Sequence, residues 1–198
     1  YKYDGGVMVT ASHNPAEYNG FKLCREQAIP VSFETGIDRI SKLTKQYHPL
    51  RGEHLGKVIV SDIFVDYKKH VLKFASNLRH LRVVIDAGNG MAGKTIPLVC
   101  EGLPIEIIPL YFELDGSFPN HEANPLKPEN MVDLQKKVRE TRAHLGVAFD
   151  GDADRCVFVD EMGRIIGCDI ITALIAKQIL EREKGATILY DLRSSWIV

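Results

Sequence analysis

The sequence lacks long apolar runs, an excess of charge of one sign and a cysteine framework. None of its apolar runs reaches the roughly 18 residues that a membrane-spanning helix requires. Lysine and arginine total 25 and aspartate and glutamate total 26, so the net charge of the 198 residues is −1. A nearly neutral chain is a poor binder of polyanions. We therefore expect neither nucleic acid nor a membrane among its partners.

Cysteine is scarce, with four residues at positions 24, 100, 156 and 168. No two of them form a C-x-x-C pair, and no histidine pair completes a zinc site. We expect reduced, mostly buried thiols and a cytoplasmic protein. The chain begins with Tyr1 and stops directly after an apolar stretch, so we also expect an internal piece of a longer protein.

Apolar residues make up 45% and charged residues 26% of the chain, which is typical of globular proteins. Short apolar runs predict strands at residues 6–10, 82–86, 105–110, 145–149, 156–160 and 187–190. The runs at 6–10 and 145–149 are of the type found in buried strands. Helical periodicity predicts helices at residues 33–46, 62–76, 91–100, 131–138 and 168–184. Strands that alternate with helices predict layered α/β domains with mixed, largely parallel sheets. Residues 48–56 are a candidate linker, and the long loop 111–130 is a candidate functional segment.

The strongest local signal is DGDADR at residues 150–155, directly after the predicted strand 145–149. Its carboxylates at Asp150, Asp152 and Asp154 repel one another by about 4 kcal/mol per pair at ~4 Å and an effective dielectric near 20. A hard cation such as Mg²⁺ or Ca²⁺ relieves that repulsion through oxygen ligands. An acidic surface turn is the plain alternative.

Two other metal or phosphate sites share parts of this pattern. An EF-hand loop starting at Asp150 would reach Glu161 at its twelfth position, but its sixth position is Arg155 where glycine is needed. A haloacid-dehalogenase-type phosphatase also places D-x-D after a strand and would use Asp150 as its nucleophile. Residues 153–155 fit the sequence pattern of that phosphatase family poorly.

A second signal, TASHNP at residues 10–15, ends the predicted strand 6–10. Ser12 is a candidate nucleophile in a polar turn of small residues, and Lys22 could return to the same site. Neighbouring Ser12 and His13 point differently along an extended chain, so they do not form a hydrolase triad by themselves. An ordinary Asn-Pro turn remains the alternative.

GNGMAG at residues 88–93 follows a strand and opens a helix, as a dinucleotide-binding turn does. The acidic residue that would bind the ribose is not at the end of the next strand, and Asp86 would place negative charge near the pyrophosphate. We therefore interpret these glycines as the requirements of a tight turn with close packing.

Together these stretches resemble the α-D-phosphohexomutase family, and most closely its bacterial phosphomannomutase/phosphoglucomutase group. Residues 9–15 and 18–22 resemble the phosphoserine loop, and residues 150–155 resemble the metal loop. Residues 88–93 and DGSFPNH at 115–121 also resemble that family's second domain. Ala153 stands where many relatives have glycine.

The resemblance covers nearly the whole chain and implies its organisation. Residues 1–57 would be the end of domain 1, residues 58–165 a complete domain 2, and residues 166–198 the start of domain 3. It implies transfer of a phosphoryl group between the 1- and 6-positions of mannose or glucose phosphate through a hexose bisphosphate. A Mg²⁺-binding phospho-acceptor module without turnover is the alternative, because the family's sugar-binding and second phosphate-binding loops are missing from the sequence given.

The resemblance also implies the roles of single residues. Ser12 would carry the phosphoryl group, and its oxygen would hold Mg²⁺ together with Asp150, Asp152 and Asp154. A phosphoserine of about −1.5 to −2 charge beside three carboxylates gives a site near −5, which requires cations.

Four further residues complete the implied site. Lys22 and Arg155 would supply positive charge, and Lys22 resembles the family's proton-transfer residue. His13 would help to position the phosphoserine. Arg193 stands where relatives place a basic residue that faces the substrate.

Overall fold

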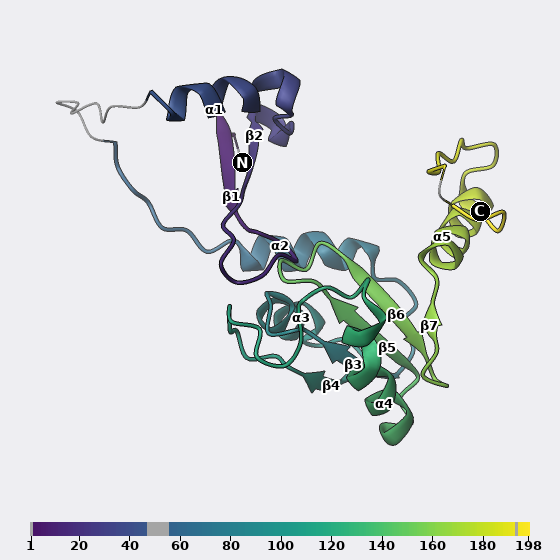
Figure 1. Ribbon diagram of the computed structural model, residues 1–198. Helices are drawn as coiled ribbons and strands as arrows, with labels where there is room; N and C mark the ends of the chain where they lie inside the picture. Colours follow the sequence, from purple (N-terminus) through teal and green to yellow (C-terminus); the bar gives the residue numbers. More distant parts are fainter. Residues whose placement is uncertain (1, 47–55, 193) are drawn as a thin grey trace.

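A five-stranded sheet with helices on both faces forms the centre of the computed structural model, which describes residues 2–46, 56–192 and 194–198 (Figure 1). The strand order is β4-β3-β5-β6-β7. The strands span Leu81–Asp86 (β3), Ile105–Leu110 (β4), Leu145–Phe149 (β5), Cys156–Asp160 (β6) and Ile165–Ile166 (β7). The α-helices span Asp38–Thr44 (α1), Phe64–Val71 (α2), Ala92–Cys100 (α3), Val132–Thr141 (α4) and Cys168–Arg182 (α5).

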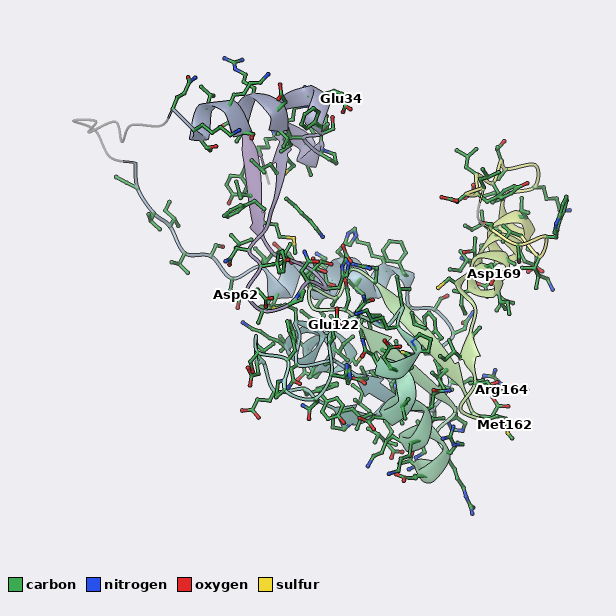
Figure 2. The ribbon with its side chains drawn as sticks, in the orientation of Figure 1. Glu34, Asp62, Glu122, Met162, Arg164 and Asp169 are labelled. Carbon is green, nitrogen blue, oxygen red and sulfur yellow. The ribbon has the colours of Figure 1, made fainter. Side chains whose placement is uncertain are left out.

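The sheet is mixed, with a parallel centre. Strand β3 pairs in parallel with both β4 and β5, whereas β5–β6 and β6–β7 are antiparallel hairpins. The predicted α/β class with a mixed, largely parallel sheet is therefore confirmed. The antiparallel pairs follow from short connections, because parallel strands need a crossover of a dozen residues or more. Met162 and Arg164, labelled in Figure 2, mark the β6–β7 turn at the opposite end of β6 from loop 150–155.

Apolar side chains on the two faces of the sheet pack against different helices. On one face Val84 lies with Leu134 and Val138 of α4, all three fully buried. A Cβ atom at Gly146 would lie 2.7 Å from Val138 Cγ2, so glycine lets α4 approach the sheet closely. The other face packs a cluster that includes Val83, Ile85, Val147 and Ile96 of α3.

A separate antiparallel hairpin precedes this sheet. Strand β1, Gly5–Val9, pairs with β2, Phe21–Arg25, and Figure 1 shows α1 beside the hairpin at the end away from the sheet. Short 3-10 or π-type turns span Glu26–Ala28, Phe33–Ile37, Leu72–Phe74 and Pro128–Met131. The loop that joins β1 to β2 contacts loop 150–155, which follows β5, and it carries the TASHNP motif.

Several expectations from the sequence are wrong. Strand β1 is exposed rather than buried, with Val9 70% exposed, because among the described residues only β2 flanks it. Residues 187–190 form no strand, and Leu189 is 90% exposed, since no described strand lies beside them. The cysteines are not buried either: Cys156 and Cys168 are exposed, and the other two are half-buried.

The other predicted strands and helices are present within a few residues of their expected bounds, although helix 33–46 is α-helical only over α1. Strand β2 was not expected. The candidate linker 48–56 lies almost entirely outside the described residues. No helix in the described part of the chain combines the length and the apolar character needed to cross a membrane.

Candidate active site

Two loops from distant parts of the chain meet at the carboxyl ends of the parallel strands. Loop 150–155 is the turn of the β5–β6 hairpin, and loop 10–20 joins β1 to β2. Figure 1 shows the loop below β1 in contact with the central domain, and hydrogen bonds join the two loops directly. Ligands of open α/β sheets bind at this end of the strands.

Ser12 points its hydroxyl into the acidic loop. Its Oγ donates to Asp150 Oδ2 at 2.9 Å and lies 3.3 Å from Asp152 Oδ1. The backbone of Ser12 has a φ of 55°, a left-handed conformation that is unfavourable for a residue with a side chain. Thr10 Oγ1 accepts the Ser12 N–H at 2.9 Å and donates to Asp152 Oδ2 at 2.9 Å. Strained backbone of this kind concentrates at functional sites.

The three aspartates of loop 150–155 form a compact cluster. One oxygen from each of Asp150, Asp152 and Asp154 lies within 4.8 Å of the others. Asp150 is fully buried, and its Oδ1 accepts the Arg155 N–H at 3.0 Å, which closes the loop. Ala153 has a φ of 60°, which explains why glycine suits this position as well. The arrangement is that of an oxygen-only cation site.

Two cations already neutralise part of this cluster. Lys22 Nζ donates to Asp152 Oδ2 at 2.9 Å and to Asp154 Oδ2 at 2.8 Å. These hydrogen bonds, to Asp154 first and then to Asp152, raise the pKa of Lys22 to about 12. Arg155 Nε lies 3.1 Å from Asp150 Oδ2. Burial raises the pKa of the Asp152 carboxyl, but the hydrogen bonds from Lys22 and Thr10 outweigh burial, so the net shift is downward.

Arg155 and His13 also contact the serine hydroxyl. Arg155 Nη2 donates to Ser12 Oγ at 3.0 Å and contacts His13 Nδ1. The His13 ring nitrogen lies 3.4 Å from Ser12 Oγ. The hydroxyl of Ser12 therefore lies between carboxylates and a guanidinium group, which suits an oxygen that gains and loses a charged group.

Gly151 and Gly90 allow the backbones of neighbouring loops to pack in direct contact. A Cβ atom at Gly151 would lie 2.3 Å from the Ser12 carbonyl oxygen, and one at Gly90 would lie 2.6 Å from the Gly151 carbonyl oxygen. Met91 N–H donates to that same Gly151 oxygen at 2.9 Å. Gly90 thus serves close packing in the 88–93 turn, and Gly88 supplies a φ of +50°.

Gly151→Ala is expected to accelerate amide hydrogen exchange in loop 10–15 at least about tenfold, because the added methyl group pushes that loop away from the aspartates. Gly116→Ala is the matched control, since nothing lies within 4 Å of a Cβ atom there. Hydrogen–deuterium exchange followed by mass spectrometry measures the rate. Equal rates for the two variants would show that the close contact is unimportant.

The structure brings together most of the residues that the sequence singled out. Ser12, His13, Lys22, Arg155 and the three aspartates lie in one cluster. Arg193 lies outside the described residues. Glu161 follows the far end of β6, so loop 150–155 lacks the twelfth ligand of an EF-hand. Thr10 and Gly151 were not anticipated, although Thr10 stands two residues before Ser12 and so shares its side of an extended chain.

The fold and the site define a class of protein: α/β proteins that gather a serine hydroxyl, basic side chains and a cluster of carboxylates at the carboxyl ends of parallel strands. Within that class, the chain belongs to the phosphoglucomutase/phosphomannomutase family. The family's α/β/α domain II matches residues 62–163, and its α/β/α domain I matches residues 1–50.

Individual relatives agree with this membership. The chain is 42% identical over 197 residues to a Xanthomonas campestris pv. campestris protein named phosphohexose mutases, covering 98% of this chain and 44% of that protein. It is 40% identical over 200 residues to the phosphomannomutase of Vibrio cholerae, covering 98% of this chain and 43% of that protein. A Burkholderia thailandensis phosphoglucomutase/phosphomannomutase family protein has a similar structure, with a TM-score of 0.79 and 34% identity. The match covers 92% of this chain and 39% of that one. The chain thus spans less than half the length of these relatives.

Proposed function

We propose that this chain carries the phosphoryl-transfer centre of a phosphohexomutase that moves phosphate between the 1- and 6-positions of mannose or glucose phosphate. The observation that carries the proposal is the contact of Ser12 Oγ with Asp150 at 2.9 Å and Arg155 at 3.0 Å. Residues 1–57 would belong to domain 1, residues 58–165 to domain 2 and residues 166–198 to domain 3. The family matches at 1–50 and 62–163 support the first two.

Ser12 accepts a phosphoryl group from a hexose bisphosphate in this proposal. Its Oγ forms a bond to phosphorus as the bond from phosphorus to the sugar oxygen breaks, and the serine proton passes to Asp150, whose oxygen already accepts it at 2.9 Å. Lys22 returns a proton to the sugar oxygen. The reverse transfer phosphorylates the other hydroxyl of the sugar. Such transfers depend on positioning and charge stabilisation, to which Arg155 and His13 contribute through their contacts with Ser12.

Mg²⁺ fits the acidic cluster by its chemistry. Asp150, Asp152 and Asp154 offer oxygens within 4.8 Å of one another, and the Lys22 ammonium group already bridges two of them as a cation does. A phosphoserine oxygen at Ser12 would complete the ligands. When bound, Mg²⁺ supplies the positive charge that stabilises the transferring phosphoryl group.

Incubation of the chain with glucose 1,6-bisphosphate and Mg²⁺ tests the proposal. We expect intact mass spectrometry to show the gain of one phosphoryl group and peptide mapping to place it on Ser12. A chain that stays unmodified, or that carries the group elsewhere, would contradict the proposal.

Lys22→Met is expected to raise the Mg²⁺ affinity of the acidic cluster about twofold to fivefold. This factor corresponds to the free energy that a half-exposed ion pair contributes. The ammonium group competes with the metal for oxygens of Asp152 and Asp154. The same variant should slow phosphoryl transfer, since Lys22 provides the proton. Lys42→Met is the control, because Lys42 pairs with Asp38 at 2.8 Å on α1, outside the cluster. Calorimetric titration with Mg²⁺ measures the affinity, and a loss of affinity in Lys22→Met would refute the competition.

A further inference from the structure

A buried ion pair lies behind the metal loop, and the chemistry proposed above does not use it. Asp86, the last residue of β3, is fully buried. Its Oδ1 accepts the Gly88 N–H at 2.8 Å, and its Oδ2 lies 3.0 Å from His121 Nε2. His121 belongs to the long loop between β4 and α4, and its side chain is 14% exposed. A buried carboxylate requires partners such as these.

The hydrogen-bond partners define the charge of His121. Its Nε2 faces the Asp86 carboxylate, and its Nδ1 lies 2.9 Å from the carbonyl oxygen of Glu122, a residue labelled in Figure 2. A carbonyl oxygen and a carboxylate are both acceptors, so this geometry favours a ring that donates from both nitrogens. The hydrogen bond to Asp86 accordingly raises the pKa of His121 above its ordinary value, against the effect of burial.

The other charged and titratable groups around this ring are accounted for. The Tyr111 ring lies edge-on to His121 at 5.3 Å, and its hydroxyl donates to Asp133 of α4 at 2.7 Å. The Glu122 carboxylate pairs with Lys127. Asp86 is therefore the counter-ion of His121.

This pair contacts the turn that touches loop 150–155. Asp86 accepts the N–H of Gly88, the first residue of turn 88–91. The side-chain amide of Asn120, next to His121, donates to Asn89 Oδ1 at 2.8 Å. The last residue of the turn, Met91, donates its N–H to Gly151 O at 2.9 Å. Gly151 separates Asp150 from Asp152, so hydrogen bonds and the backbone of turn 88–91 together connect His121 to the acidic loop.

We propose that Asp86 and His121 are positioning residues that fix turn 88–91 against Gly151 and thereby set the separation of the metal-binding carboxylates. The proposal deepens the function proposed above and rests on it for the identity of the metal site. Some residues orient metal ligands without binding the metal themselves. Replacing such a residue typically lowers metal affinity by about 10–100-fold.

His121→Phe tests the proposal, since phenylalanine keeps a ring beside Tyr111 but donates no hydrogen bond. We expect Mg²⁺ affinity to fall about tenfold by calorimetry. Amide hydrogen exchange at Met91 should accelerate at least about tenfold, while exchange at Val84 in β3 stays unchanged. Val138→Ala, a core change in α4, is the control for general destabilisation and should leave the Mg²⁺ affinity as it is.

Asp86→Asn separates charge from geometry. The asparagine can accept from Gly88 and donate to a neutral His121, which still donates to Glu122 O, so the network closes without an ion pair. In the unmodified chain, the stabilisation that protonated His121 gives the turn is present in full below the ordinary histidine pKa of 6.5 and is lost as the pH rises through the raised pKa of the folded state. Met91 exchange should therefore depend on pH in the unmodified chain and not in Asp86→Asn, once the intrinsic pH dependence of exchange is removed.

The outcomes distinguish this proposal from the proposed function. Unchanged Met91 exchange and unchanged Mg²⁺ affinity in His121→Phe would overturn the positioning role while leaving the metal site intact. If the unmodified chain binds no Mg²⁺, the proposed metal site is wrong instead. The rate of amide exchange at Met91 still decides whether His121 holds the turn. Should His121→Phe not fold, the same pH dependence in Asp86→Asn as in the unmodified chain would overturn the positioning role.

Discussion

Ser12→Ala is expected to abolish phosphoryl acceptance by the chain and to lower mutase activity of the enzyme by about 10⁴-fold or more, the scale seen when a nucleophile is removed. The hydroxyl of Ser12 is the group that lies between Asp150, at 2.9 Å, and Arg155, at 3.0 Å. Alanine keeps the strained loop but offers no oxygen to phosphorus. Intact mass spectrometry after incubation with a hexose bisphosphate, and a coupled assay of mutase activity, give the two readings.

Ser117→Ala is the matched control for this prediction. Ser117 is an exposed serine in the loop between β4 and α4, and its hydroxyl donates to Asp115 at 2.7 Å. We expect phosphoryl acceptance in that variant to equal that of the unmodified chain. Phosphoryl uptake by Ser12→Ala would show that another group is the acceptor.

Asp152→Asn is expected to weaken Mg²⁺ binding about 100-fold or more. A unit charge at ~4 Å is worth about 4 kcal/mol at an effective dielectric near 20, and each tenfold change in affinity corresponds to about 1.4 kcal/mol. Asp152 also links loop 150–155 to the β1–β2 hairpin, since Thr10 and Lys22 both donate to it at 2.9 Å. Calorimetric titration with Mg²⁺ measures the loss.

Asp160→Asn controls for a change of charge in the same hairpin. Asp160 ends β6 and pairs with Arg164 at 2.7 Å, at the end of β6 away from loop 150–155. Its replacement should leave Mg²⁺ affinity unchanged. Equal affinities of Asp152→Asn and the unmodified chain would remove the aspartate loop as the metal site.

The central sheet could be predicted from the sequence because its strands are short, apolar and bounded by polar turns. Residues 145–149 and 156–160 have this pattern, and both are strands with those bounds. Strand β2 was missed because FKLCR at residues 21–25 shows neither an apolar run nor strict alternation. The wrong strand at 187–190 has the opposite cause: an apolar run forms a strand only beside a partner, and none of the described strands supplies one.

The parts of the site were predictable from the sequence, but their assembly was not. Spacing within DGDADR predicts an acidic cluster by itself, because its carboxylates are close along the chain. No local pattern predicts that Ser12 meets Asp150, a contact between residues 138 positions apart, and only the family resemblance brought the two loops together. The Asp86–His121 pair was missed for the same reason, because 35 positions separate its members.

The sequence separation within the site has a consequence for the order of folding. The β5–β6 turn closes over six residues, whereas its contact with Ser12 closes over 138. Local contacts form early, and distant ones require loop closure that costs more entropy. The acidic loop should therefore be complete while the β1–β2 hairpin is still undocked. Hydrogen exchange would then show the Thr10–Gly20 region opening with a lower free energy than β3 and β5, so that the serine separates from the aspartates well before the central sheet unfolds.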